Sequence, residues 1–151
     1  MSRYDAPANP YAGWELMKTL PVRLFPGEDL RRALEAAAAG HGIDAAFVLS
    51  GIGSLTDARL RFAGAAEPHR LVGELEILTL SGTLSGVASH LHASVAGSDG
   101  RVFGGHVAYG CTIRTTAEVL LAPLDDWRFT READPATGYA ELAIHPKVTG
   151  R

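Results

Sequence analysis

From residue 73 to residue 82 the chain alternates between two sets of side chains, which is the pattern of a long extended strand. Glu74, Glu76, Leu78 and Leu80 alternate with Leu75, Ile77, Thr79 and Ser81. Successive side chains of a strand point to opposite faces of a sheet, so this segment presents two distinct faces. Further strands are expected at about 14–25, 45–50, 55–62, 89–96, 101–107, 111–114, 118–122 and 139–144. Because short turn-like links join most of them, we expect a largely antiparallel sheet.

One segment carries a helical pattern. Glu28 and Asp29 place negative charge at its start, and apolar residues then recur on one face to about Ala39, with Gly40 as the expected stop. Many strands and few helices indicate an α+β fold. The chain has 151 residues, which fits one compact domain, expected over 13–147, with short tails at 1–12 and 148–151.

Composition narrows the classes of function. The formal net charge is −3 and no run of Lys and Arg occurs, which disfavours DNA binding through phosphate contacts. Cys111 is the only cysteine, so no internal disulfide can form, and it is interpreted as a small buried apolar residue. The N-terminus has no apolar signal-like region and no apolar run could span a bilayer, so we expect a cytoplasmic protein without membrane contact.

Three of the six histidines are concentrated at His90, His92 and His106. His90 and His92 are two residues apart on one expected strand, so they share a face. Two imidazoles from one strand and a third from its neighbour give the ligand set of a catalytic zinc site with one open position. We therefore predict a metal site, with zinc as the favoured ion.

The third ligand depends on the register of one hairpin. If residues 98–100 form a three-residue loop with Gly100 in the left-handed conformation, His92 lies opposite His106 and all three rings share a face. If Asp99 and Gly100 alone form the turn, His106 pairs with Ala93 and points away. Gly100 fits the first register, although a bulge at 104–105 could change either.

Other polar residues could contribute to the site, but each also has a simpler structural role. Glu118 could act as a general base or orient a metal-bound imidazole, although a solvated strand residue is the simpler interpretation. Arg114 could pair with an anionic ligand or with Glu118. His41 is explained by helix capping, and His69 and His145 are expected at the surface.

Several segments together resemble the plants-and-prokaryotes conserved (PPC) domain. They are PGEDL at 26–30, GELEILTLSG at 73–82, HLHAS at 90–94, DGRV at 99–102, GGH at 104–106, RTTAE at 114–118 and TGYAEL at 137–142. The resemblance spans about residues 14 to 146. It implies a compact α+β domain that assembles as a homotrimer. In plants this domain accompanies AT-hooks that grip DNA, but the Arg-Gly-Arg core of such a hook does not occur in this sequence.

The fold is also similar to that of acetolactate decarboxylase, a zinc enzyme whose His-x-His and later histidine match His90, His92 and His106. The decarboxylase's other catalytic residues have no matched positions here, so the reaction does not follow. Three interpretations stay open. They are a homotrimeric zinc-binding domain with a small-molecule pocket and lyase or hydrolase-like chemistry, a DNA-associated regulatory or assembly module, and a trimeric scaffold with vestigial histidines.

Overall fold

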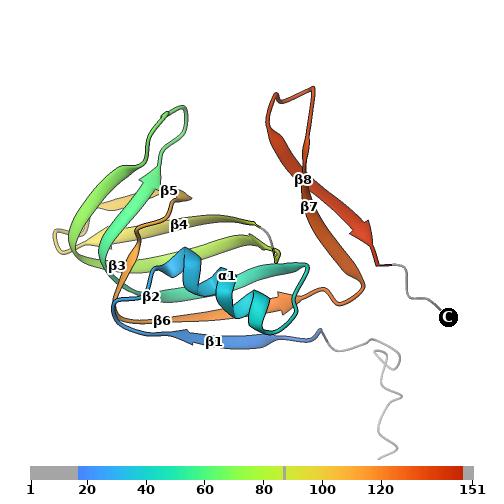
Figure 1. Ribbon diagram of the computed structural model, residues 1–151. Coiled ribbons are helices and arrows are strands. Elements are labelled where there is room, and N and C mark those ends of the chain that lie inside the picture. Colours follow the sequence, from blue (N-terminus) through green and yellow to red (C-terminus); the bar gives the residue numbers. More distant parts are fainter. Residues whose placement is uncertain (1–16, 87, 148–151) are drawn as a thin grey trace, which may run out of the picture.

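The computed structural model describes residues 17–86 and 88–147, and the predicted tails lie outside this range. Its main element is a six-stranded sheet (Figure 1). The strands are β1 (Leu20–Leu24), β2 (Ala46–Arg61), β3 (His69–Leu84), β4 (Ser89–Gly97), β5 (Val102–Val107) and β6 (Thr112–Pro123). Their order is β1-β6-β2-β3-β4-β5, and every pairing is antiparallel.

The sheet curls until its last strand meets an inner one again. The end of β2 pairs with β5 through Leu60 with Val107 and Arg61 with His106. The curl encloses an apolar core in which large side chains such as Leu55, Leu84 and Leu91 are at most 1% exposed. This closure brings His106 beside a strand that is distant in sequence.

Helix α1 (Leu30–Gly40) covers part of the core and lies along the sheet in Figure 1. Asp29 caps its first turn by accepting a hydrogen bond from the Arg32 amide at 3.0 Å. Leu30, Leu34 and Ala38 form its buried face. The helix ends at Gly40, one residue later than expected, and Gly42 rather than Gly40 takes the left-handed conformation, with φ of 65°.

No helix within 17–86 or 88–147 combines the length and apolarity needed to cross a membrane.

Strand β3 runs from His69 to Leu84 rather than over the expected 73–82, and two other strands each join segments that the sequence pattern separated. Residues 45–50 and 55–62 were expected as separate strands, but β2 continues through Gly51 and Gly53 with shifts in register. Likewise β6 joins the segments expected at 111–114 and 118–122. Bulges account for both breaks in the alternation, because an extra residue reverses the face on which later side chains lie.

A second, two-stranded sheet follows the main one. It consists of β7 (Trp127–Ala133) and β8 (Ala140–Pro146), and Figure 1 shows this hairpin standing beside the ends of β3 and β4. Phe129 anchors it, being 3% exposed and packed edge-on against Phe47. The sequence pattern missed β7, in which Phe129 is the only buried residue. The chain is a single α+β domain with one helix in its described part.

Candidate metal centre

Strand β4 places His90 and His92 on its outward face. The intervening Leu91 is fully buried and Ala93 is 6% exposed, so these two residues point into the core. The histidines necessarily take the other face. The local pattern of burial therefore explains why both imidazoles project from one side of the sheet.

The hairpin register brings His106 to the same face. His92 pairs with His106 and Ala96 with Val102, without a shift between them. Gly100 has φ of 77° and its amide donates to the Gly97 carbonyl at 2.9 Å. The three-residue loop and its register are thus confirmed, and no bulge interrupts the pairing at 104–105.

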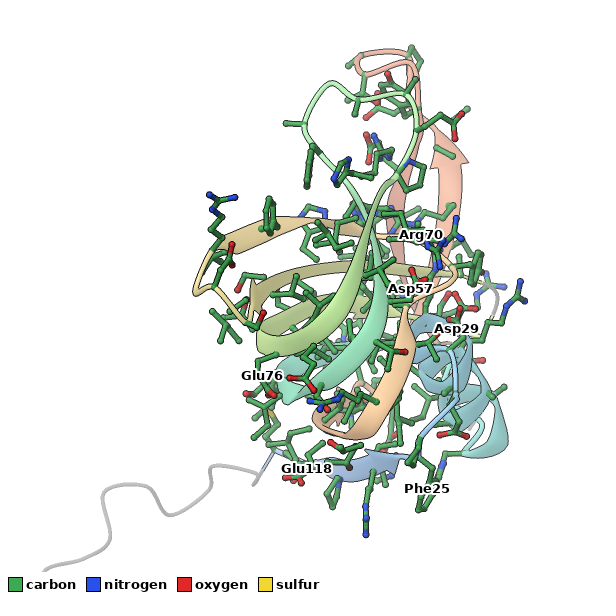
Figure 2. All side chains as sticks on the ribbon, turned by 90° about the vertical axis from the view of Figure 1, so that its left-hand side faces the viewer. Phe25, Asp29, Asp57, Arg70, Glu76 and Glu118 are labelled. Atoms are coloured by element: carbon green, nitrogen blue, oxygen red, sulfur yellow. The ribbon has the colours of Figure 1, made fainter. Side chains whose placement is uncertain are left out.

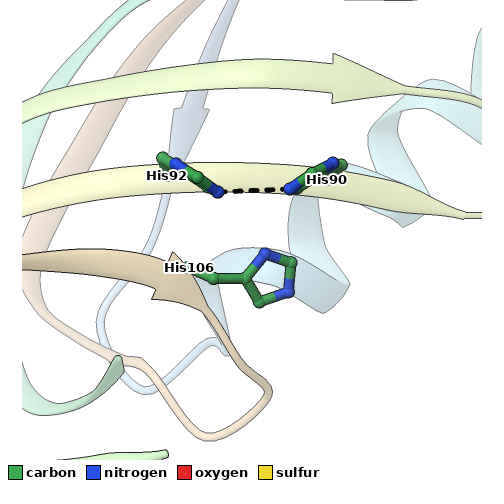
Figure 3. A group of neighbouring side chains, drawn as sticks. All are labelled: His90, His92 and His106. Carbon is green, nitrogen blue, oxygen red and sulfur yellow. Dashed lines mark hydrogen bonds between the residues drawn. The ribbon is translucent and has the colours of Figure 1, made fainter. Parts of the chain in front are cut away.

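The three imidazoles converge (Figure 3). Ring centroids are 5.0 Å apart for His90 and His92, 5.0 Å for His90 and His106, and 5.7 Å for His92 and His106. One ligating nitrogen can be chosen from each ring so that all lie within 4.8 Å of one another. The Nε2 atoms of His90 and His92 are 3.1 Å apart. Two nitrogens bound tetrahedrally to one zinc ion would be about 3.3 Å apart, so the pair fits such an ion closely.

The surroundings of His90 and His106 favour the neutral form of these two rings. Burial, followed by the positive fields of His90 and Arg31, lowers the pKa of His106 to about 4. Burial and then the charge of Arg131 lower the pKa of His90 as well. Neutral imidazole is the form that binds a metal, because a protonated ring has no free lone pair.

One nitrogen of the cluster lacks a partner. The Nδ1 atom of His106 is buried and makes no hydrogen bond to any described residue. Figure 3 shows this nitrogen, next to the Cβ-bearing ring carbon, turned toward His90 and His92. A buried unpaired nitrogen costs about 1–3 kcal/mol. Coordination to a shared ion would satisfy it, and the residues present therefore fit a metal.

Two glycines permit the strands around the cluster to approach closely. A Cβ at Gly82, where φ is 141°, would lie 2.0 Å from the His90 carbonyl oxygen. A Cβ at Gly105 would lie 2.7 Å from the Arg61 carbonyl oxygen. Only glycine can occupy these positions without displacing β4 beside His90 or β5 beside His106.

Arg31 of α1 ties together the backbones that flank the histidines. Its guanidinium donates to the Ser89 carbonyl at 2.8 Å and to the Val107 carbonyl at 3.2 Å. It also donates to the Ser89 hydroxyl at 2.9 Å and pairs with Glu35 at 3.1 Å. Since Ser89 precedes His90 and Val107 follows His106, one side chain fixes the spacing of β4 and β5 at the cluster.

The cluster opens into two adjoining cavities. One, of about 720 Å³, is lined in part by His90, His106, Arg31, Arg61, Arg131 and Glu141. The other, of about 290 Å³, adjoins His90, His92, Arg131 and Glu141. The hairpin β7–β8 supplies Arg131 and Glu141 to both. A small molecule entering the larger cavity would meet the imidazoles and three guanidinium groups.

Glu118 lies apart from the histidines. It is exposed on β6, where it pairs in register with Arg23 of β1 and Ile52 of β2, and Figure 2 shows it beside β1. It does not line either histidine cavity in the described part of the chain. Arg114 pairs with Glu74 rather than with Glu118.

The remaining candidates have structural roles. His41 caps α1 through a contact of 2.9 Å between its Nδ1 and the Ala37 carbonyl. His69 is exposed and stacks on Phe62. His145 is half-buried in the second hairpin, 2.9 Å from Glu132. Cys111 is fully buried, and burial raises the pKa of its thiol to about 11, so it is an unreactive core residue.

Sequence reasoning missed the arginines around the site. Arg31 alone has a local signal, since it is four residues before Glu35 and next to the buried Leu30, which places it at the edge of the packed face. Arg61 pairs in register with His106 only because the sheet curls. Arg131 reaches the site on a strand without alternation. No local pattern identifies the last two.

A family model matches residues 11–125, namely that of the Plants and Prokaryotes Conserved (PCC) domain. Two proteins called bifunctional protein GlmU, from two Synechococcus strains, are 50% and 49% identical to this chain over 130 and 128 residues. The alignments cover 86% and 85% of this chain but only 21% of each relative. The chain thus spans about a fifth of the length of these relatives.

Solved structures share the fold. A hypothetical protein from Salmonella enterica is 35% identical, with a TM-score of 0.85 and coverage of 88% of this chain and 96% of that chain. A metal-containing protein from Archaeoglobus fulgidus is 31% identical, with a TM-score of 0.70 and coverage of 85% and 95%. A Bacteroides thetaiotaomicron protein whose name assigns it provisionally to DNA binding has a TM-score of 0.74 and coverage of 86% and 94%. At 21% identity, that last likeness concerns the fold alone.

Proposed function

Since the chain belongs to the Plants and Prokaryotes Conserved (PCC) domain family, we propose that it is a zinc-binding member with a small-molecule cavity. The observation that carries this proposal is the convergence of His90, His92 and His106, whose ligating atoms lie within 4.8 Å of one another. The metal content of the Archaeoglobus fulgidus relative supports it.

The chemistry follows from the ligand set. A divalent ion held by three neutral imidazoles with an open position supplies Lewis acidity toward a carbonyl group or a bound water. His90, His92 and His106 would hold it, while Arg31 keeps the two strands at the right spacing. This arrangement suits lyase or hydrolase reactions on a small molecule. We further propose that the protein acts in the cytoplasm, since its single cysteine cannot form an internal disulfide.

The metal content of the purified protein tests this function. Elemental mass spectrometry should find near-stoichiometric zinc in the wild type and almost none in His90→Ala/His92→Ala. His69→Ala is the matched control, because His69 is also a strand histidine but lies outside the cluster. Unchanged zinc in the double variant, or no zinc uptake by the wild type even after zinc addition, would refute the proposal.

We further propose that the domain assembles as a homotrimer through the outer face of its sheet. Four exposed apolar side chains lie there on the adjacent strands β6, β2 and β3. They are Leu49 (44% exposed), Ile52 (54%), Leu78 (47%) and Leu120 (36%). A groove of about 530 Å³ lined by Pro21, Ile52 and Leu120, among others, lies on the same face. Clustered exposed apolar residues of this kind favour contact with another protein surface.

DNA association is the alternative function, which the resemblance to the plant domain that accompanies AT-hooks raises. The negative net charge of this chain and its lack of an Arg-Gly-Arg segment oppose it. A salt-dependent mobility shift of DNA by the purified domain would support this alternative. No shift at low salt would remove it.

A further inference from the structure

The larger of the two cavities at the histidines, of about 720 Å³, is lined by more guanidinium groups than carboxylates. Three arginines line it, at positions 31, 61 and 131, against the single carboxylate of Glu141. Arg31 is already paired with Glu35 at 3.1 Å. Among residues 17–86 and 88–147, neither Arg61 nor Arg131 has a carboxylate within 4.0 Å.

The two unpaired guanidiniums approach the cluster from different elements. Arg61 is opposite His106 in the β2–β5 pairing, so its side chain lies on the same face as that imidazole. Arg131 of β7 lines both cavities, and its Nη2 donates to the Thr83 hydroxyl at 3.4 Å. That contact holds the guanidinium over β3 and leaves its other N–H groups free to bind.

From this arrangement we infer that the cavity binds a small organic anion through the guanidiniums of Arg61 and Arg131. The anionic group is a carboxylate or a phosphate, since guanidinium N–H pairs match the oxygens of both. The inference rests on the proposed zinc site, because an oxygen of the same anion would take the open position of the ion. Glu141 at the edge of the cavity would accept hydrogen bonds from hydroxyl groups of the ligand.

Charge and volume support this ligand class. Two unpaired guanidiniums against one carboxylate leave a net positive charge, and a divalent ion on three neutral imidazoles would add two more. Charges of one sign gathered at a cavity attract a counter-charge and raise the local concentration of anions. A cavity of about 720 Å³ is within the range of small-molecule sites.

Calorimetric titration of the zinc-loaded protein tests the inference. Glycolate serves as the carboxylate probe, inorganic phosphate as the phosphate probe, and ethylene glycol as the neutral control, all at constant ionic strength. We expect one anion to bind the wild type, and Arg131→Gln and Arg61→Gln each to weaken it about tenfold. Arg128→Gln is the matched control, being an exposed arginine of β7 that lines neither cavity. The tighter probe identifies the anionic group.

Two measurements on the same samples separate this inference from the zinc proposal. Zinc content is determined for every variant, and each titration is repeated on metal-free protein. If the protein binds zinc but no anion, the anion site is refuted and the zinc site stands. The same holds if it binds zinc and both arginine variants bind the anion as tightly as the wild type. Arginine-dependent anion binding by a protein that takes up no zinc supports the anion site and overturns the zinc site.

Discussion

Arg31 acts on the histidine cluster without touching a ring nitrogen. Its contacts to the Ser89 and Val107 carbonyls hold the residues directly next to His90 and His106. Hydrogen bonds from a charged donor to partly buried acceptors are stronger than neutral ones. The alignment of two metal ligands from different strands therefore depends on one side chain of the helix.

Replacement of Arg31 should weaken metal binding. We expect Arg31→Gln to lower zinc affinity about tenfold, the size typical of residues that orient ligands from outside the coordination sphere. Competition with a chromophoric chelator measures this affinity. Arg32→Gln is the control, since Arg32 is the exposed neighbour on the same helix. Equal affinities in the two variants would show that Arg31 does not position the ligands.

Cys111 makes stability depend on pH at the alkaline end. Its thiol has a pKa of about 11 in the folded chain, raised by burial from 9.0. The unfolded thiol ionises first as pH rises, so the stabilising contribution is complete below pH 9 and is lost toward pH 11. Urea unfolding should therefore show wild-type stability falling more steeply than that of Cys111→Ala between these values. Parallel pH curves for the two proteins would contradict the raised pKa.

At the scale of elements, the close contact of β3 and β4 requires a glycine beside His90. Gly73 and Gly82 both lie on β3 with positive φ, of 135° and 141°. A Cβ at Gly73 meets nothing within 4 Å, whereas one at Gly82 would collide with the His90 carbonyl. Substitution of Gly73 therefore introduces backbone strain alone, whereas substitution of Gly82 adds a steric clash that displaces β4 at the site.

Alanine substitutions at these glycines should have different consequences. Gly73→Ala should cost about 1–3 kcal/mol of unfolding free energy through strain alone and leave zinc content unchanged. Gly82→Ala should cost more and also reduce zinc content, because β4 must shift at His90. Denaturant unfolding and elemental analysis measure the two effects. If both variants retained full zinc, the close contact would not govern the geometry of the site.

The elements differ in how much of them could be predicted from the sequence. Alternation identified β3, although a register shift between Ile77 and Thr79 exposes Leu78 and turns Leu80 to the core. Gly100 in the loop identified the register that unites His92 with His106. These features are local, since a turn residue and a two-residue period determine them. Strand β7 and the curl that pairs Arg61 with His106 depend on contacts between distant segments. Such contacts leave no periodic pattern, so the histidines could be predicted but the arginines facing them could not.

At the scale of the whole molecule, the histidines and the exposed apolar residues occupy different strands, with the histidines on β4 and β5. The arginine-rich cavity lies beneath the β7–β8 hairpin, although the chain as a whole is negative. The exposed apolar residues lie on the outer face of β2, β3 and β6, where Gly53 pairs with Ile77 and Ser50 with Leu120. The residues Leu49, Ile52, Leu78 and Leu120 line neither histidine cavity.

Introduction of charge into that surface should dissociate the assembly. Ile52 is 54% exposed at the centre of the outer face, and Ile52→Glu would place a carboxylate in an apolar interface, where desolvation is costly. Light scattering coupled to size-exclusion chromatography should give three times the chain mass for the wild type and the mass of one chain for Ile52→Glu. Val102→Glu, at a comparably exposed position on β5, should keep the wild-type mass.

A monomeric wild type would refute the trimer. If Ile52→Glu stayed trimeric, the outer face around Ile52 would not be the interface. Because Ile52 lines neither histidine cavity, zinc retained by a monomeric Ile52→Glu variant would also establish that each chain builds its metal site alone.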